Sequence, residues 1–362
     1  MSGAAAGRPK VPKASNAVLT PLNSAATLTD RAGMREVAER AGVAMSSVSR
    51  VLSGHPDVST AMRARVMAAV EALGYEPNML AQMLRSGATH TVGFVVGDIS
   101  NPLLAQIALG AEVRLRAAGY AMLLTNSVNE ANLDATHIRL LQQRRVDGLL
   151  LSLSDETSDE TLDALTRSMT PSVLVDRDLP LDEPFSAVLS DHASGIHQAV
   201  DRLVALGHDR IALVAGSPHV RPTRERINAL EDVLENHLGV VGQVRSGAFT
   251  EAHGKAATRE LLAGRRPPTA IIAGGNQILV GVLDELGARK VRVPADISLV
   301  TCDDVPLAKF FTPTLAMINR DPYEIGLAAA GLLLDRLSGH PPETVILPTT
   351  FVTAASCGRP PR

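Results

Sequence analysis

The sequence predicts a small three-helix domain followed by a larger α/β body whose doubly wound parallel sheets form two lobes. The first observation is the helical spacing of apolar residues between positions 34 and 73. The second is a change at Thr91, after which short apolar runs alternate with helix-length segments. Strands that alternate with helices are typical of parallel sheets. The length of 362 residues is sufficient for two or three domains.

Three short helices are expected over residues 34–41, 45–52 and 60–73. Gly42 follows the first as a residue that can adopt positive φ, Ser59 is the expected N-cap of the third, and Gly74 follows its end. The apolar positions of the three helices would bury one small core, made of Met34, Val37, Ala38, Ala41, Val48, Val51, Leu52, Met62, Val66, Ala69, Val70 and Leu73.

The second of these helices, "MSSVSRVL", has a compact polar outer face. Four residues remain outside when its valines face the core, namely Ser46, Ser47, Ser49 and Arg50. In a helix-turn-helix the second helix enters the major groove, where small hydroxyl side chains allow close approach and an arginine can read a guanine with two hydrogen bonds. The alternative is a solvated face of a helical cap, because serine and arginine satisfy that role too.

The stretch "YEPNMLAQMLRSG", residues 75–87, predicts a helix of about nine residues that begins at Asn78. Such a short helix is marginal in water by itself. Leu80, Met83 and Leu84 give it an apolar stripe, which favours pairing with a copy from another subunit, and Leu84 is a candidate wedge between bases. A linker helix docked on the body is the alternative.

Beyond Thr91, apolar runs predict strands that are too numerous for one core, so two similar lobes are expected. The runs cover residues 91–96, 120–125, 147–152, 172–176, 187–190, 210–216, 269–275 and 297–304. Ligands bind beyond the carboxyl ends of such strands. This rule selects the residues that follow them: 98–104, 176–177, 190–191, 217–226, 274–277 and 303–304. Helix capping is the alternative for each single Asp or Asn among them.

The charge of the chain is unevenly distributed. The net charge is −3, but residues 1–90 hold 10 basic and 6 acidic side chains (+4), and the remainder holds 25 and 32 (−7). A basic end on an acidic body suggests a polyanion partner for that end, with uneven sampling as the alternative. Cys302 and Cys357 have no paired spacing, so neither a disulfide framework nor a metal site is expected.

No apolar stretch is long enough for a signal sequence or a membrane span, so a cytoplasmic protein is expected. Residues 1–30 are expected to be a disordered tail, because Arg8, Lys10 and Lys13 lie there among Ala, Ser and Pro. Neither a G-x-x-x-x-G-K-[ST] motif nor a strand-following G-x-G-x-x-G motif is present, and no cofactor or catalytic residue is expected.

From about Gly33 to Thr353 the sequence resembles the lac repressor family (LacI/GalR) of bacterial transcription regulators. The blocks that carry the resemblance are "VAERAGVAMSSVSRVLSG", "VSTAMRARVMAAVEALGYEPNMLAQMLRSG", "RRVDGLLL", "LVDRDLP", "LVALGHDRIALVAG", "PTAIIAGGN", "VPADISLVTCDD" and "FFTPTLAMI". The resemblance implies a helix-turn-helix headpiece over residues 31–77, a hinge helix and linker over 78–90, a periplasmic-binding-protein-like effector domain over 91–353 and a C-terminal tail over 354–362.

The resemblance also implies roles for residues of the headpiece and hinge. Met45, Ser46 and Arg50 would contact bases, and Ser47, Ser49 and Ser59 would hold phosphates or cap helices. Asn78, Ala81 and Leu84 would belong to the hinge helix in the minor groove. Gly33 and Ala44 depart from the hydroxyl caps usual in the family. The loss of a capping contact at Ala44 is expected to cost about 1 kcal/mol.

In the effector cleft the resemblance implies eight ligand-contacting residues: Leu103, Leu104, Asp176, Ser190, Arg226, Phe249, Asn276 and Asp303. Arg226 could bind a carboxylate or hydroxyl pair through its planar fork. Leu103 and Leu104 stand where some relatives have aromatic residues, and "GGNQ" at 274–277 replaces the usual Asn-Asp pair.

The resemblance implies a homodimer or tetramer that binds near-palindromic double-stranded operator DNA and responds to a small-molecule effector, a sugar or related metabolite. Such a regulator is expected to act as a repressor. Two alternatives are a solute-binding protein of the same two-lobed fold and a nucleotide-using α/β enzyme. The missing signal sequence and the intact helix-turn-helix pattern disfavour the first, and the absent phosphate-binding motifs disfavour the second.

Overall fold

The computed structural model describes residues 33–52, 55–75, 88–182, 185–304 and 310–361. The chain divides into two compact units, Met1–Ser86 and Gly87–Arg362.

The N-terminal unit contains the three expected helices, α1 (Met34–Ala41), α2 (Met45–Leu52) and α3 (Thr60–Leu73). Gly42 and Gly74 end α1 and α3 in the left-handed region, with φ of 63° and 56°. Ser59 caps α3, because its side chain accepts a hydrogen bond from the Met62 N–H. The helices bury one core centred on Val37, Val48 and Val66, in agreement with the helical spacing of the sequence.

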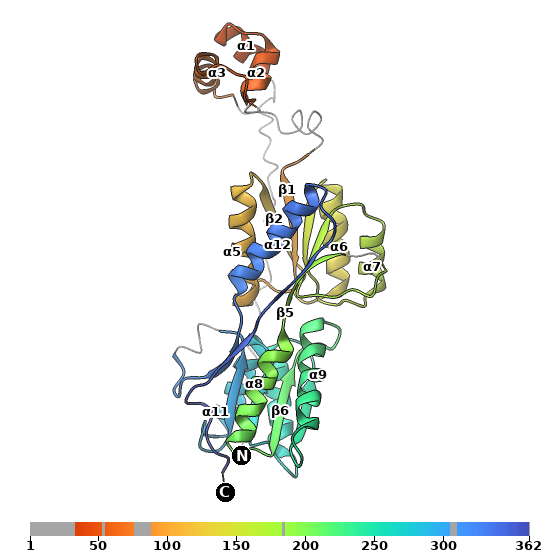
Figure 1. Cartoon of the computed structure of the whole chain (residues 1–362), viewed down its shortest axis with the longest axis vertical. Helices are drawn as coiled ribbons and strands as arrows, with labels where there is room; N and C mark the ends of the chain where they lie inside the picture. Colours follow the sequence, from red (N-terminus) through yellow and green to blue (C-terminus); the bar gives the residue numbers. More distant parts are fainter. Residues whose placement is uncertain (1–32, 53–54, 76–87, 183–184, 305–309, 362) are drawn as a thin grey trace, which may run out of the picture. The chain divides into compact units, whose positions relative to one another are not determined.

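The larger unit contains two six-stranded sheets, each of which belongs to one lobe (Figure 1). The strand order in the first lobe is β11-β5-β4-β3-β1-β2, and all of its strand pairs are parallel. Its strands are β1 (Thr91–Val96), β2 (Ala121–Asn126), β3 (Gly148–Ser152), β4 (Ser172–Val175), β5 (Ser186–Ser190) and β11 (Thr344–Leu347).

The second lobe has the order β12-β10-β9-β8-β6-β7, in which only the pair of β10 with β12 is antiparallel. Its strands are β6 (Arg210–Ala215), β7 (Val241–Ser246), β8 (Ala270–Ala273), β9 (Ser298–Cys302), β10 (Ala316–Asn319) and β12 (Thr350–Val352). The two lobes of mainly parallel sheet confirm the predicted fold class.

Helices cover both faces of each sheet. In the first lobe α5 (Pro102–Ala117) and α12 (Pro322–Leu337) cover one face, and α6 (Ala131–Gln143) and α7 (Asp159–Thr166) cover the other. In the second lobe α8 (His192–Ala205) and α9 (Arg221–Glu235) lie opposite α10 (Glu251–Ala263) and α11 (Asn276–Ala288). Most of the buried apolar area is therefore divided among four cores.

Glycines permit close crossings of paired helices. A Cβ atom on Gly326 of α12 would lie 2.0 Å from the Ile107 carbonyl oxygen in α5, and one on Gly281 of α11 would lie 2.0 Å from the Glu251 oxygen in α10. Only a residue without a side chain allows two helix backbones to approach this closely. The crossing of α12 on α5 matters for the site because α5 begins at the carboxyl end of the first sheet.

The chain passes between the two lobes three times. It crosses from β5 to α8, from β10 to α12, and from β11 to β12, so the C-terminal α12 and β11 belong to the first lobe (Figure 1). The first and third crossings are joined, because the Asp191 N–H donates to the Leu347 oxygen at 2.9 Å and the Thr349 hydroxyl donates to the Asp191 oxygen. Three adjacent connections make a hinge around which two lobes can rotate.

Residues 354–361, which were predicted to form a C-terminal tail, pack on the second lobe. Ser356 is fully buried, and its hydroxyl donates to the Leu299 oxygen and accepts from the Ala316 N–H. The Gly358 N–H donates to the Ser298 hydroxyl. Strands β9 and β10 thus obtain hydrogen-bond partners from this segment, which is why it does not form a free tail. Among the described helices, none combines the length and apolar character needed to cross a membrane.

Candidate functional site

Helix α2 presents the polar face that the sequence predicted. Val48 and Val51 are buried in the core of the N-terminal unit, whereas Met45 is 52% exposed and Ser46 and Arg50 are exposed. Ser47 and Ser49 are half-buried at the sides of the helix. Short hydroxyl side chains along most of this face would let the helix backbone come close to a nucleic-acid groove.

Arg50 is oriented by the segment that follows α2. Its guanidinium lies 3.4 Å from Nδ1 of His55 and 3.5 Å from a carboxylate oxygen of Asp57. Both acidic and basic side chains of this pair are largely exposed, so the contact is weak in energy and easily exchanged for a stronger acceptor.

Gly33 and Ala44, which stand where the family usually has hydroxyl caps, differ in the groups that accept or donate hydrogen bonds at the helix start. At Gly33 the Glu36 carboxylate accepts the Gly33 N–H at 2.8 Å, which replaces part of the missing cap. At Ala44 only the backbone oxygen participates, accepting the N–H groups of Ser47 and Val48 at 2.9 and 3.2 Å. The start of α2 therefore has no side-chain cap from position 44.

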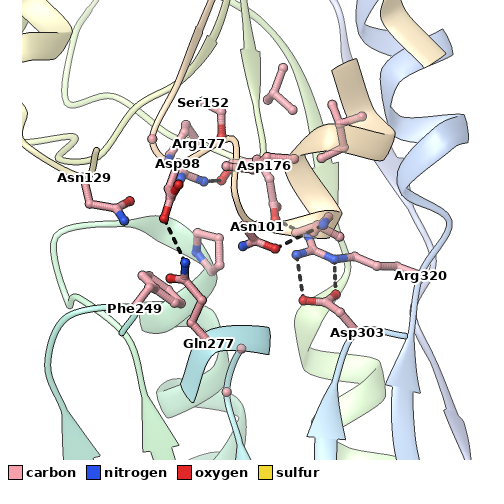
Figure 2. Close-up of a pocket in the computed structure, with 18 of the residues that line it drawn as sticks. Asp98, Asn101, Asn129, Ser152, Asp176, Arg177, Phe249, Gln277, Asp303 and Arg320 are labelled. Carbon is pink, nitrogen blue, oxygen red and sulfur yellow. Dashed lines mark hydrogen bonds and ion pairs between the residues drawn. The ribbon is translucent and has the colours of Figure 1, made fainter. Parts of the chain in front are cut away.

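A cavity of about 70 Å³ lies between the two lobes at the carboxyl ends of their strands (Figure 2). Six of the eight predicted effector-contacting residues line it: Leu103, Leu104, Asp176, Arg226, Phe249 and Asp303. Leu103 and Leu104 come from the start of α5, and Phe249 packs against Gly216 and Gly275 of the second lobe. Both lobes thus contribute apolar walls and charged side chains to one cavity.

The other two predicted residues, Ser190 and Asn276, lie behind the lining of this cavity. Ser190 is fully buried, its N–H donates to Asp176 and its hydroxyl accepts from Arg320. The Asn276 amide donates to the Asn101 side-chain oxygen at 3.0 Å, which joins the lobes. In this arrangement both side chains position other residues of the site.

Asp176 and Asp303 are held at the ends of β4 and β9 in an unusual backbone conformation. Their φ angles are 54° and 73°, in the left-handed region that aspartate tolerates better than most residues. Both carboxylates are buried, with exposures of 4% and 5%. Non-glycine residues kept in this region often mark functional sites.

Arg320 connects these two carboxylates. Its Nε donates to Asp303 at 2.6 Å, and its other guanidinium nitrogens donate to Asp303 and Asp176 (Figure 2). One of them also donates to the Ser190 hydroxyl at 3.0 Å. Burial alone would raise the pKa of Asp303, but Arg320 and then Arg226 hold that pKa below its usual range. Both carboxylates are therefore ionised at neutral pH.

His192 completes the surroundings of Asp176. Its Nε2 lies 3.0 Å from Asp176, and because a carboxylate only accepts hydrogen bonds, Nε2 carries the hydrogen. Burial lowers the pKa of His192 to about 4 despite the opposing effect of Asp176. Burial would raise the pKa of Asp176, but His192 and Arg320 hold it well below its usual range. His192 is thus a neutral hydrogen-bond donor near pH 7.

Further contacts join the lobes at the edge of the cavity. Gln277 of the second lobe donates to Asp98 at 2.8 Å (Figure 2). It also donates to Ser100 at 3.2 Å. Glu156 of the first lobe is 1% exposed and accepts the backbone N–H of Arg221 and the guanidinium of Arg224, at 2.8 and 2.6 Å. These bonds form only when the lobes are close together, so this structure shows the two lobes in contact at the edge of the cavity.

Arg320, Asn129 and Ser152 are polar lining residues that the sequence patterns did not indicate. Arg320 directly follows β10, and the rule that selected Asp176 and Asp303 would have selected it had the apolar run "LAMI" been taken as a strand. Asn129 follows β2 by a short turn. Asp98, Asn101, Arg177 and Gln277 line the cavity from within the post-strand ranges, although none was singled out as a contact.

The site combines hydrogen-bonding groups with apolar walls, which is typical of reversible binding of a small polar molecule. Together with a helix-turn-helix unit, such a hinged cleft defines a DNA-binding regulator with a ligand-sensing domain. The family model "Bacterial regulatory proteins, lacI family" matches residues 33–78, and "Periplasmic binding protein-like domain" matches residues 200–357.

Similar proteins cover nearly the whole chain. The ribose operon repressor of Escherichia coli (strain K12) is 33% identical over 310 residues, which cover 85% of this chain and 93% of that protein. The HTH-type transcriptional repressor PurR of Haemophilus influenzae (strain PittEE) is 29% identical, covering 85% and 91%. The lac repressor dimer bound to operator and the anti-inducer ONPF matches with a TM-score of 0.78 and 26% identity, covering 90% and 99%.

The structure of the CelR–cellobiose complex, a transcriptional regulator, matches with a TM-score of 0.68 and 32% identity, covering 90% of this chain and 100% of that one. The chain belongs to the lacI family of bacterial regulatory proteins. It is a DNA-binding transcriptional regulator whose larger domain responds to a small-molecule effector, and the family consists of regulators rather than enzymes.

Proposed function

We propose that this regulator is a repressor that binds a near-palindromic operator as a homodimer. Two such dimers could also assemble into a tetramer. A polar metabolite such as a sugar controls the affinity of the protein for DNA. The similarity to relatives named as repressors, and to a lac repressor dimer bound to operator, supports this proposal. A dimer with twofold symmetry requires two half-sites related by the same symmetry.

In this proposal α2 enters the major groove. Met45, Ser46 and Arg50 contact base edges, while the half-buried Ser47 and Ser49 and the helix cap Ser59 contact phosphates or stabilise helix ends. The exposure of Met45, Ser46 and Arg50 supports the first assignment, since base-reading side chains must be accessible.

The observation that carries the proposal is that one cavity is lined by side chains of both lobes. A ligand held there interacts with both lobes at once, so it stabilises one arrangement of the hinge over the others. The effector would contact Asp176, Arg226, Phe249 and Asp303 between the apolar walls of Leu103 and Leu104. Ser190 and Asn276 would position these contacts from behind.

The coupling to DNA is assigned to residues 78–90 on the basis of the sequence. Asn78, Ala81 and Leu84 lie outside the described residues, so their role in a hinge helix stays a prediction. A helix of about nine residues is marginal by itself and would persist only when paired. An effector that favours separated hinge helices would be an inducer, and one that favours paired helices would be a corepressor.

The site of action would be the cytoplasm, where a bacterial repressor meets its operator; the relatives named as bacterial transcriptional repressors support this location. A solute-binding function of the same two-lobed fold is less well supported, because the matches to these repressors extend over both the helical unit and the body.

The test is to capture genomic DNA fragments with the purified full-length protein, and then to screen metabolites for release or retention of the recovered fragment. A few fragments that share an inverted repeat are expected. The control is Val48→Asp, which places a charge in the fully buried core of the N-terminal unit and should abolish capture. Recovery of the same fragments by this variant, or of random fragments by the native protein, would contradict the proposal.

A further inference from the structure

Arg320 occupies the two carboxylates that a polyol ligand would need. Its Nε and one terminal nitrogen donate to Asp303, and its remaining terminal nitrogen donates to both Asp176 and the Ser190 hydroxyl. Asp176 also accepts from the Ser190 N–H and from His192. These contacts fill most of the acceptor positions that two carboxylates offer.

A neutral hydroxyl would therefore compete with a buried ion pair. Arg320 is 7% exposed, and both of its carboxylate partners are buried. Separating such a pair inside the protein leaves uncompensated buried charges, a cost that a hydroxyl group cannot repay. Asp176 and Asp303 are thus poor acceptors for a sugar hydroxyl as long as Arg320 stays between them.

Arg226 is in a different electrostatic position from Arg320. It is 4% exposed, it lines the cavity, and its NH1 donates to the Gly274 backbone oxygen at 2.8 Å. Within the described part of the chain no carboxylate oxygen lies within 4.0 Å of its guanidinium nitrogens, although Asp303 is near enough to feel its charge. The oxygens of Asp303 are turned to Arg320 instead.

The neighbouring cations do have acidic partners. Arg221 pairs with Asp176 at 3.2 Å, and Arg224 pairs with Glu156 at 2.6 Å. His192 adds no charge at neutral pH, because burial holds its pKa at about 4. Arg226 is therefore a buried cation that faces the cavity and still lacks a bound counterion. A planar guanidinium group binds a carboxylate or a phosphate through two parallel hydrogen bonds.

We propose that the effector carries an anionic oxygen group, a carboxylate or a phosphate, which binds Arg226, and that Arg320 sets this preference by occupying Asp176 and Asp303. The inference rests on the proposed effector-binding role of the cleft and names the chemical class of its ligand. Arg320 is a specificity-determining residue in this scheme, because it removes the two acceptors that would favour a neutral polyol.

The test compares three ligands with the same five-carbon skeleton: ribose, ribonate and ribose 5-phosphate. Calorimetry on the full-length protein without DNA is expected to show that ribonate or ribose 5-phosphate binds at least about tenfold more tightly than ribose. Which of the two anions binds better distinguishes a carboxylate from a phosphate. Ribose binding as tightly as both anions, or no binding of either anion, overturns the proposal.

Two variants test whether Arg226 and Arg320 are responsible for the preference for an anionic ligand. Arg226→Gln should abolish the preference for the anion, and Arg320→Gln should reverse it by freeing two carboxylates for hydroxyl groups. Arg139→Gln is the matched control, because it removes an exposed guanidinium from α6, which is remote from the cavity lining. An unchanged preference in a folded Arg320→Gln protein contradicts the role of Arg320.

A second measurement covers the case in which Arg320→Gln does not fold. Inorganic phosphate should raise the melting temperature of the native protein more than chloride at the same ionic strength, and Arg226→Gln should remove this difference. An equal effect of both salts on the native protein counts against the proposal. Because DNA is absent from all these assays, failure of the anion preference is distinguishable from failure of operator capture.

Discussion

Gly326 in α12 lies so close to Ile107 in α5 that a Cβ atom on the glycine would be 2.0 Å from the Ile107 carbonyl oxygen. A second contact of the same kind joins Gly110 of α5 to the Tyr323 oxygen of α12, at 2.2 Å from an added Cβ. The two helix backbones are therefore in direct contact. This crossing fixes the start of α5, from which Asn101 and Leu104 reach the cavity.

Gly326→Ala should lower the free energy of unfolding of the larger unit by about 2 kcal/mol or more, because the helices must separate to accommodate the methyl group. Gly331→Ala is the matched control in the same helix. A Cβ there meets nothing within 4 Å, so this variant should gain up to about 1 kcal/mol from helix propensity. Calorimetric melting of both variants checks the pair, and equal effects would argue against the close crossing.

Arg50→Ala should weaken binding to the specific operator by about 1–3 kcal/mol and change nonspecific DNA binding much less, because the contact proposed for Arg50 is to a base edge. Titration of labelled operator and of a scrambled duplex at one salt concentration measures both quantities. Arg65→Ala removes the same charge from the exposed surface of α3 and should affect the two duplexes equally. An equal loss on both duplexes for Arg50→Ala would refute its base-reading role.

Ala44→Ser should stabilise the N-terminal unit by about 1 kcal/mol, since a serine oxygen can accept an N–H group at the start of α2 that has only a backbone acceptor now. Thermal melting of the full-length protein, followed at the transition of this unit, is the measurement. Ala64→Ser, at an exposed position inside α3, should instead destabilise the unit by about 0.5 kcal/mol. A loss at both positions would show that α2 accepts no cap there.

Acidification should weaken the larger unit through His192. The pKa of this residue is about 4 in the folded protein, where burial lowers it, and 6.5 in its reference state. The unfolded chain therefore binds the proton first. The contribution of neutral His192 to the free energy of unfolding is fully present above about pH 6.5 and is lost as the pH falls toward about 4. The loss amounts to about 2 kcal/mol between about pH 7 and about pH 5.

Urea denaturation at both pH values measures this effect against His192→Gln, whose amide can still donate to Asp176 but does not titrate in this range. The variant should lose less stability than the native protein on acidification. If both proteins respond identically to pH, another group is responsible for the change.

Helix boundaries in the N-terminal unit could be predicted because periodic apolar residues and local signals agree. Gly42, Ser59 and Gly74 are placed where the chain must change conformation, and each acts through its own backbone or side chain. Strands such as β1 and β3 were evident because strands buried on both faces have continuous apolar sequences. In these cases short-range patterns determine the structure.

Two edge strands, β7 and β12, could not be predicted in this way, although the edge strand β2 could. β7 has the sequence "VGQVRS" and exposed ends, and β12 has only three residues. Their pairing depends on partners far away in the chain. The same limitation affected the site, because Arg320 was missed together with β10, whereas Asp176 and Asp303 follow strands that were evident. Ser190 and Asn276 lie behind the cavity lining because of tertiary packing. The spacing of residues along the sequence does not encode this packing.

The three crossings between the lobes have a consequence for synthesis on the ribosome. The sheet that begins with β1 is completed only by α12 and β11, which are encoded more than 200 residues later. An emerging chain must therefore leave exposed the part of that sheet face that α12 covers while the whole intervening lobe is translated. Nascent chains stalled before Pro322 should consequently depend on chaperones, and neither lobe can be expressed as one contiguous fragment.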